Sequence, residues 1–138
     1  MYETILVTLD ATPTDRAIIQ HIKKLAAVMN SSIVLLHVAT SVPALFNGPD
    51  AAGQEIESDQ AYLSSLKSEF ESANIPARTE LAYGDPVKEI VKWIESNRCD
   101  LVAMSTHGHQ FVADLVLGTT ANRVQHSVSV PVLLLRAK

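Results

Sequence analysis

The chain has 138 residues, of which 47% are hydrophobic and 19% are charged, and its net charge is −4 at pH 7. So many apolar residues exclude intrinsic disorder, and this length is typical of a single domain, here residues 1–138. The net negative charge argues against nucleic-acid binding, which requires clustered Lys and Arg side chains.

The same features favour a cytoplasmic protein. No stretch of the sequence approaches 18 uninterrupted apolar residues, so we expect no membrane span. The first residues lack the basic start and the apolar run of a secretion signal. Cys99 is the single cysteine and cannot form an internal disulfide, which agrees with a reducing compartment.

The first part of the chain predicts a strand, a helix and a second strand. Residues 4–9 are apolar and β-branched and too few for a helix, so they predict a strand. We expect Thr12 to cap the following helix, with Asp15 at the capping-box position. Apolar residues then recur with helical spacing, and residues 33–38 predict the second strand.

An irregular stretch interrupts this alternation. Residues 40–55 contain two prolines and two glycines, which predicts a loop that is functional or mobile. A second helix is expected over about residues 56–73 and a short third strand over residues 78–83.

The last part of the chain continues the pattern. Asp85 is expected to cap a third helix, and residues 100–104 predict a fourth strand. A glycine-containing loop over residues 105–118 and a helix over about residues 119–127 then lead to a last strand at residues 130–135.

Strands that alternate with helices predict an α/β fold with a doubly wound parallel sheet. Ligands of such sheets bind beyond the carboxyl ends of the strands, where the strand order reverses. The segment Gly118-Thr119-Thr120 is expected to open the last helix, so that free backbone N–H groups and two hydroxyls converge on an anion such as a phosphate chain. The residues alone leave open that Gly118 merely starts the helix and Thr119 caps it. The glycine spacing matches neither a Walker loop nor a dinucleotide fingerprint.

The sequence resembles the universal stress protein family over nearly its whole length. The stretches that carry the resemblance are residues 5–12, 35–38, 84–86, 100–104 and 127–133. In addition, Ser105-x2-Gly108-x9-Gly118-Thr119 is similar to the Gly-x2-Gly-x9-Gly-(Ser/Thr) motif of the nucleotide-binding members, with a serine in place of the first glycine.

This resemblance implies a five-stranded, Rossmann-like sheet with strand order 3-2-1-4-5, and a site for ATP or another adenine nucleotide with Mg²⁺ bridging the phosphates. The residues implied for the site are Thr8, Leu9, Asp10, Val38, Met104, Ser105, His107, Gly108, Gly118, Thr119 and Thr120. The backbone around Thr8 and Val38 would meet the adenine, and Asp10 would accept hydrogen bonds near the adenosine. The resemblance also implies a homodimer joined through the last strand at Val132, Leu133, Leu134 and Leu135.

The sequence therefore favours an adenine-nucleotide-binding regulatory protein of the stress response, whose output is a conformational or dimerisation state. We expect residues 40–55 to order over the bound nucleotide. Residues 105–120 contain no Lys or Arg, so binding is expected to be modest or to depend on Mg²⁺.

One alternative is a family member that has lost nucleotide binding and acts through protein contacts, which Ser105 favours. A second alternative is a slow ATPase. The loop over residues 105–118 argues against it, because it has no Lys or Arg to stabilise the charge on the γ-phosphate.

Two polar residues outside the glycine motif carry expectations of their own. Asp10 is expected to be a carboxylate buried at a strand end, which is costly without a partner and therefore favours a functional role. His37 lies among apolar neighbours and is expected to be a hydrogen-bonded core histidine. We expect neither a catalytic residue nor a dedicated metal site, because His107 and His109 have no third ligand nearby.

Overall fold

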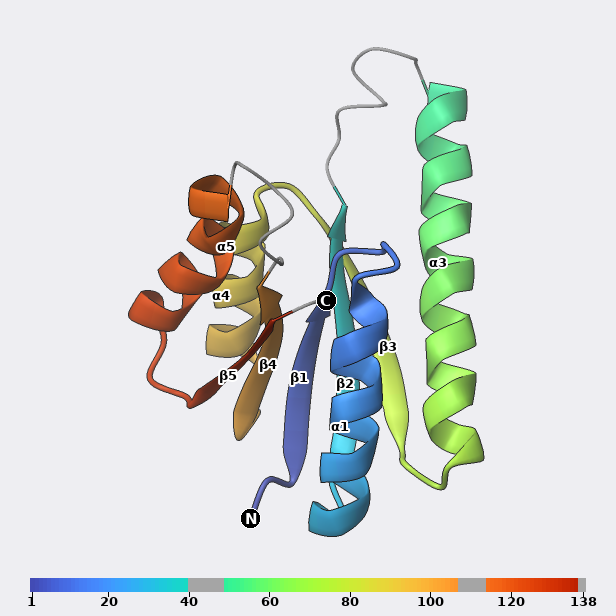
Figure 1. The fold of residues 1–138 in the computed structure, drawn as a ribbon. Coiled ribbons are helices and arrows are strands. Elements are labelled where there is room, and N and C mark those ends of the chain that lie inside the picture. The colour runs from blue at the N-terminus through green and yellow to red at the C-terminus, as the bar shows by residue number, and fades with distance from the viewer. Residues whose placement is uncertain (40–48, 107–113, 137–138) are drawn as a thin grey trace.

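The computed structural model describes residues 1–39, 49–106 and 114–136. In this part of the chain, five strands form one parallel sheet in the order β3-β2-β1-β4-β5 (Figure 1). The strands are β1 (Thr4–Leu9), β2 (Ser32–Ala39), β3 (Ala77–Tyr83), β4 (Leu101–Thr106) and β5 (Val132–Arg136). The helices are α1 (Asp15–Met29), α3 (Pro49–Ser72), α4 (Pro86–Ser96) and α5 (Asp114–Ser127). The doubly wound fold and its strand order are confirmed.

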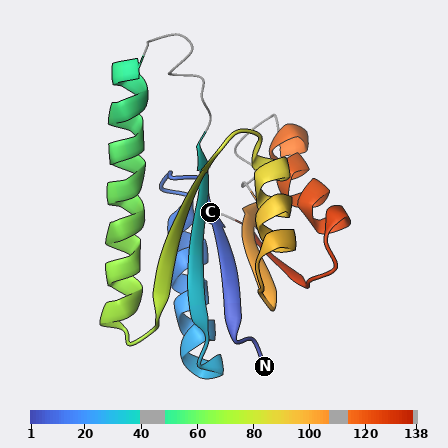
Figure 2. The ribbon, with the colours of Figure 1, turned by 180° about the vertical axis from the view of Figure 1, so that it is seen from behind.

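Two hydrophobic cores lie on opposite faces of the sheet. Helices α1 and α3 cover one face, and α4 and α5 cover the other, as Figures 1 and 2 show from the two sides. Successive residues of a strand point to opposite faces, so Ile5 and Val7 of β1 pack toward α1 and α3, whereas Leu6 packs toward α4 and α5. Because both faces of β1 are covered, the three consecutive residues Ile5, Leu6 and Val7 are all apolar and fully buried, as the sequence predicts.

Helix α3 begins at Pro49, and the predicted start near residue 56 is wrong. Proline is well tolerated in a first helical turn, and the alanines that follow it are strong helix formers. The second part of the predicted loop is therefore helical. Residues 40–48 lie outside the described residues. The expectation that this stretch orders over a ligand therefore stays a prediction.

The ends of the other helices show which local signals predict structure well. The Asp85 side chain accepts a hydrogen bond from the Lys88 N–H at 2.9 Å, and Pro86 occupies the first turn of α4, so this predicted cap is confirmed. Thr12 does not cap α1, because that helix begins at Asp15 and the residue before it makes no side-chain capping bond. Within the described residues, no helix combines the length and the hydropathy needed to cross a membrane.

Candidate functional site

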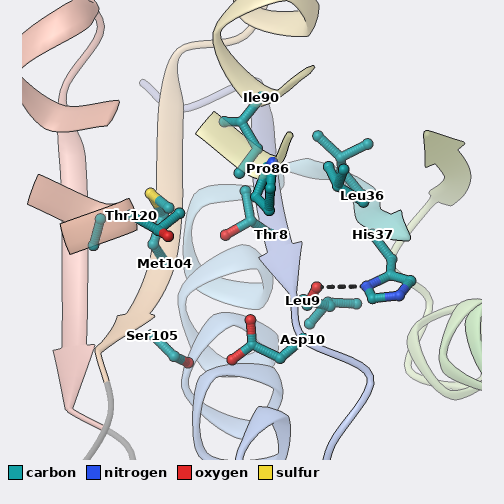
Figure 3. A pocket seen from close by; sticks show the side chains of 12 residues that line it. Thr8, Leu9, Asp10, Leu36, His37, Pro86, Ile90, Met104, Ser105 and Thr120 are labelled. Carbon is teal, nitrogen blue, oxygen red and sulfur yellow. Dashed lines mark hydrogen bonds between the residues drawn. The ribbon is translucent and has the colours of Figure 1, made fainter. Parts of the chain in front are cut away.

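A cavity of about 290 Å³ lies at the carboxyl ends of β1, β2 and β4, on the face of the sheet that α4 and α5 cover (Figure 3). Its lining residues are Thr8, Leu9, Asp10, Leu36, His37, Val38, Pro86, Ile90, Met104, Ser105, Thr120 and Ala121. Strand β1 has β2 on one side and β4 on the other, which is where the strand order reverses. The cavity is therefore at the position where ligands of doubly wound sheets bind.

The structure brings together most of the residues that the sequence assigns to a ligand site. The predicted residues that line the cavity are Thr8, Leu9, Asp10, Val38, Met104, Ser105 and Thr120. They come from the ends of three neighbouring strands and from α5. His107 and Gly108 lie outside the described residues, and the backbone of Gly118 and Thr119 belongs to α5.

The predicted opening of the last helix at Gly118 is wrong. Helix α5 begins at Asp114, so Gly118 is its fifth residue. Only the first four backbone N–H groups of an α-helix lack an intrahelical partner, and these belong to residues 114–117. An acidic residue is favoured in the first turn and leucines are strong helix formers, which explains the earlier start. The amides of Gly118, Thr119 and Thr120 are therefore not the free N–H groups at the start of a helix, and Thr120 lines the cavity.

The Ser105 hydroxyl is an unusual group in the cavity wall. Its Oγ atom is buried and has no hydrogen-bond partner among the described residues. In Figure 3 this hydroxyl and the Asp10 carboxylate point into the same space. Leaving a buried hydroxyl unsatisfied costs about 1–3 kcal/mol, so such an atom needs an explanation, for which a bound water, ion or ligand would each suffice.

Asp10 differs from the expectation of a buried carboxylate. Asp10 is exposed and directly follows the carboxyl end of β1, where the chain turns away from the sheet. Among the described residues, the cavity lining includes Asp10 and His37 but no Lys or Arg, and its hydroxyl groups are those of Thr8, Ser105 and Thr120.

Asp15 organises the turn that carries Asp10, a role that sequence reasoning missed. Its carboxylate accepts hydrogen bonds from the Asp10 N–H and the Ala11 N–H, both at 2.9 Å, and its side chain is almost fully buried. The Tyr62 hydroxyl of α3 donates a third bond at 2.7 Å. Ala11 adopts a left-handed conformation with φ of 62°, which an alanine rarely does, and the carboxylate holds it there. An aspartate in the first turn of a helix was the available signal, but it reaches farther back than a capping box does.

His37 is confirmed as a hydrogen-bonded core histidine, and it also lines the cavity. Its Nδ1 lies 2.8 Å from the carbonyl oxygen of Leu9 (Figure 3). A carbonyl only accepts, so Nδ1 carries the proton. Its Nε2 lies 3.5 Å from Oδ2 of Asp59 in α3, and both side chains are largely buried.

The fold and the cavity together define a doubly wound α/β protein with a cavity at the reversal of strand order, the position at which such sheets bind ligands. The model of the Universal stress protein family matches residues 1–136, so the chain belongs to that family.

Individual relatives agree with this assignment. The universal stress protein MJ0531 of Methanocaldococcus jannaschii is 27% identical, over 99% of this chain and 83% of its own length. A solved structure of MJ0577 from the same organism has a TM-score of 0.87 and 24% identity, covering 100% of this chain and 98% of that one. A universal stress protein solved in complex with cAMP has a TM-score of 0.75 and 17% identity, covering 99% of this chain and 98% of its own.

Proposed function

We propose that this protein binds an adenine nucleotide in the cavity and acts as a regulatory protein of the stress response. The observation that carries the proposal is the buried Ser105 hydroxyl, which has no partner among the described residues, in a cavity at the reversal of strand order. The cAMP complex of a universal stress protein with the same fold supports the choice of ligand.

The composition of the wall suits the nucleoside part of such a ligand. Small-molecule sites combine apolar walls with a few placed polar groups, and a volume near 290 Å³ is at the small end of their range. We propose that the purine packs against the apolar side chains of Val38, Ile90 and Met104. The hydroxyls of Ser105 and Thr120 would then be available to the sugar and its first phosphate.

The proposed phosphate contacts come from the sequence motif. His107, Gly108, Gly118 and Thr119 stay predicted phosphate contacts, and they follow the lining residue Ser105 or precede Thr120 along the chain. Mg²⁺ is usually held through substrate phosphates together with one or two carboxylates, so we propose that it arrives with the nucleotide and that Asp10 is its nearest protein oxygen.

Calorimetric titration tests this function. The purified protein is titrated with ATP, AMP and cAMP, each with and without Mg²⁺, and GTP serves as the matched control. We expect saturable binding of at least one adenine nucleotide, and tighter binding of ATP when Mg²⁺ is present. A folded protein that binds none of the adenine nucleotides would overturn the proposal and favour a family member that acts through protein contacts alone.

We further propose a cytoplasmic homodimer joined through β5. This strand is at an edge of the sheet, and Leu134 on it is 39% exposed. An apolar edge strand left bare invites pairing with another chain, and a two-fold axis satisfies it symmetrically. Sedimentation should show a dimer for the wild type and a monomer for Leu134→Lys. A wild-type monomer at micromolar concentration would exclude this assembly.

A further inference from the structure

Two polar side chains of α3, one helical turn apart, reach the end of β1 through an intermediate residue each: Asp59 through His37 and Tyr62 through Asp15. Asp59 and Tyr62 are three residues apart, so they project from the same side of α3. Figures 1 and 2 show this helix on the same face of the sheet as α1. The intermediate residues bond to three consecutive residues, Leu9 to Ala11. The first two of these three line the cavity.

The first contact runs from Tyr62 through Asp15 to the backbone of the turn. The Tyr62 hydroxyl donates to one oxygen of the Asp15 carboxylate, and the two oxygens together accept the N–H groups of Asp10 and Ala11. Burial, followed by the hydrogen bond to Asp15, raises the pKa of the Tyr62 hydroxyl, which therefore stays a donor. The turn is thus fixed by a carboxylate that α3 itself holds in place.

The second contact runs from Asp59 through His37 to the Leu9 carbonyl. The Nδ1–H of His37 donates to that carbonyl, and the opposite side of the ring faces the Asp59 carboxylate. His37 is one of the residues that line the cavity, and its ring lies between α3 and the end of β1. A shift of α3 at Asp59 would therefore reach the Leu9 carbonyl, and with it the cavity edge, through this ring.

These polar contacts are not what holds α3 on the sheet. Leu63, Leu66 and Phe70, which follow along the same helix, are almost fully buried in the core that they form with α1 and the sheet. Glu69 adds ion pairs with Arg16 at 2.7 Å and Lys23 at 3.0 Å of α1. The later turns of α3 are thus anchored independently, and its Asp59–Tyr62 turn can change its contacts without undocking the helix.

We propose that Tyr62 and Asp15 are positioning residues for the cavity, and that through them α3 responds to a nucleotide bound there. This inference rests on the proposed nucleotide site. A ligand that contacts Asp10 binds more tightly when the turn is already fixed, because it does not bear the cost of ordering it. Coupling between two sites is reciprocal, so the bound ligand must in turn stabilise the Asp15–Tyr62 contact and the α3 turn that carries it.

The test compares Tyr62→Phe, which removes one hydroxyl, with Tyr83→Phe as the matched control. Tyr83 is 47% exposed, and no hydrogen bond of its hydroxyl is found among the described residues. Binding of ATP with Mg²⁺ and of AMP is measured by calorimetry. We expect Tyr62→Phe to weaken binding about fivefold or more, which is the size of a typical coupling, and Tyr83→Phe to bind as the wild type does.

Hydrogen exchange supplies a readout that a merely structural role would not move. In the wild type, nucleotide should slow exchange of the amides around Asp59 and Tyr62, and this slowing should be lost in Tyr62→Phe but kept in Tyr83→Phe. Without ligand, Tyr62→Phe should already speed exchange of the Ala11 amide. Asp15→Asn should weaken binding further, and adding Tyr62→Phe to it should cost little more, because the two side chains act in one path.

The outcomes separate this inference from the function on which it rests. If the wild type binds no adenine nucleotide, both the site and the coupling are overturned. If the wild type binds but Tyr62→Phe has the same affinity and the same ligand-dependent exchange in α3, the nucleotide site stands and the coupling is overturned.

Discussion

Replacing Ser105 with alanine should stabilise the free protein while weakening its binding of nucleotide. The Oγ atom is buried without a partner among the described residues, and a buried unsatisfied hydroxyl costs about 1–3 kcal/mol. Removal of this atom also loses some packing, so we expect a net gain of about 1 kcal/mol in the free energy of unfolding. For a domain of this size, that corresponds to a rise in Tm of about 3–5 °C.

The binding effect has the opposite sign, because a bound nucleotide is proposed to satisfy the same hydroxyl. Loss of one hydrogen bond costs about 0.5–1.5 kcal/mol, which is a two- to tenfold rise in Kd. Urea denaturation and calorimetric titration on the same preparation measure the two quantities. Opposite signs are informative, because general damage to the fold would lower both stability and affinity.

Ser127→Ala is the matched control for this experiment. The Ser127 hydroxyl is exposed and donates to the Arg123 carbonyl oxygen at 2.7 Å, far along α5 from the cavity residue Thr120. Its stability should change by no more than about 0.5 kcal/mol, and its Kd should equal that of the wild type. The reasoning is refuted if Ser105→Ala is less stable than the wild type, or if it binds adenine nucleotide equally well.

Three further predictions concern groups away from the cavity. Asp85→Ala removes the cap that accepts the Lys88 N–H and should cost about 1 kcal/mol in urea denaturation, and an unchanged midpoint would contradict the capping role. Burial raises the pKa of the Cys99 thiol, so alkylation by iodoacetamide at pH 7 should be slower in the native protein than in urea; equal rates would contradict this. The hydrogen bond from Arg16 lowers the pKa of the Glu69 carboxyl, so this group stabilises the fold above the ordinary glutamate pKa and the contribution is lost as pH falls through the lowered value. The stability difference between wild type and Glu69→Gln should therefore shrink from pH 7 to acidic pH, and a difference independent of pH would contradict it.

The sheet could be predicted from the sequence because short local patterns of apolar residues identify its strands. Residues 4–9 and 33–38 are too short and too continuously apolar for amphipathic helices, and only a sheet covered on both faces buries them. Asp85 followed by proline likewise specifies a helix start within a few residues. In each of these cases the signal and its physical partner are neighbours along the chain.

The start of α5 was mispredicted because two local signals compete there. Glycine followed by two threonines is typical of a helix start, whereas the preceding Asp-Leu-Val-Leu run is itself a good first turn. The structure follows the second signal and begins the helix at Asp114. Propensity alone cannot rank two such starts, because the difference between them is a few tenths of a kcal/mol per residue.

The supports of the cavity could not be predicted, because their partners are distant in sequence. Tyr62 is 47 positions from Asp15, and His37 is 28 positions from Leu9. Helical spacing shows only that Tyr62 lies on the side of α3 that faces the protein, and it does not say which polar group the hydroxyl meets. Part of the lining, at the strand ends and at Thr120, could therefore be assigned from the sequence and its family resemblance, whereas Pro86, Ile90 and Ala121 and the residues that hold the lining in position could not.

This division has a physical origin in the doubly wound fold. The carboxyl ends of parallel strands are brought together by the sheet itself, so any polar residue that follows a strand is delivered to the same edge. The turn that leaves β1 has no such constraint, and it holds Ala11 at a positive φ only because the Asp15 carboxylate captures its N–H. A carboxylate buried to 1% exposure in turn needs every oxygen satisfied, which the Tyr62 hydroxyl completes from α3. The sheet thus brings the lining residues together, and the Tyr62–Asp15 contact holds the turn that carries Asp10, which is the physical basis of the proposal that α3 responds to a bound nucleotide.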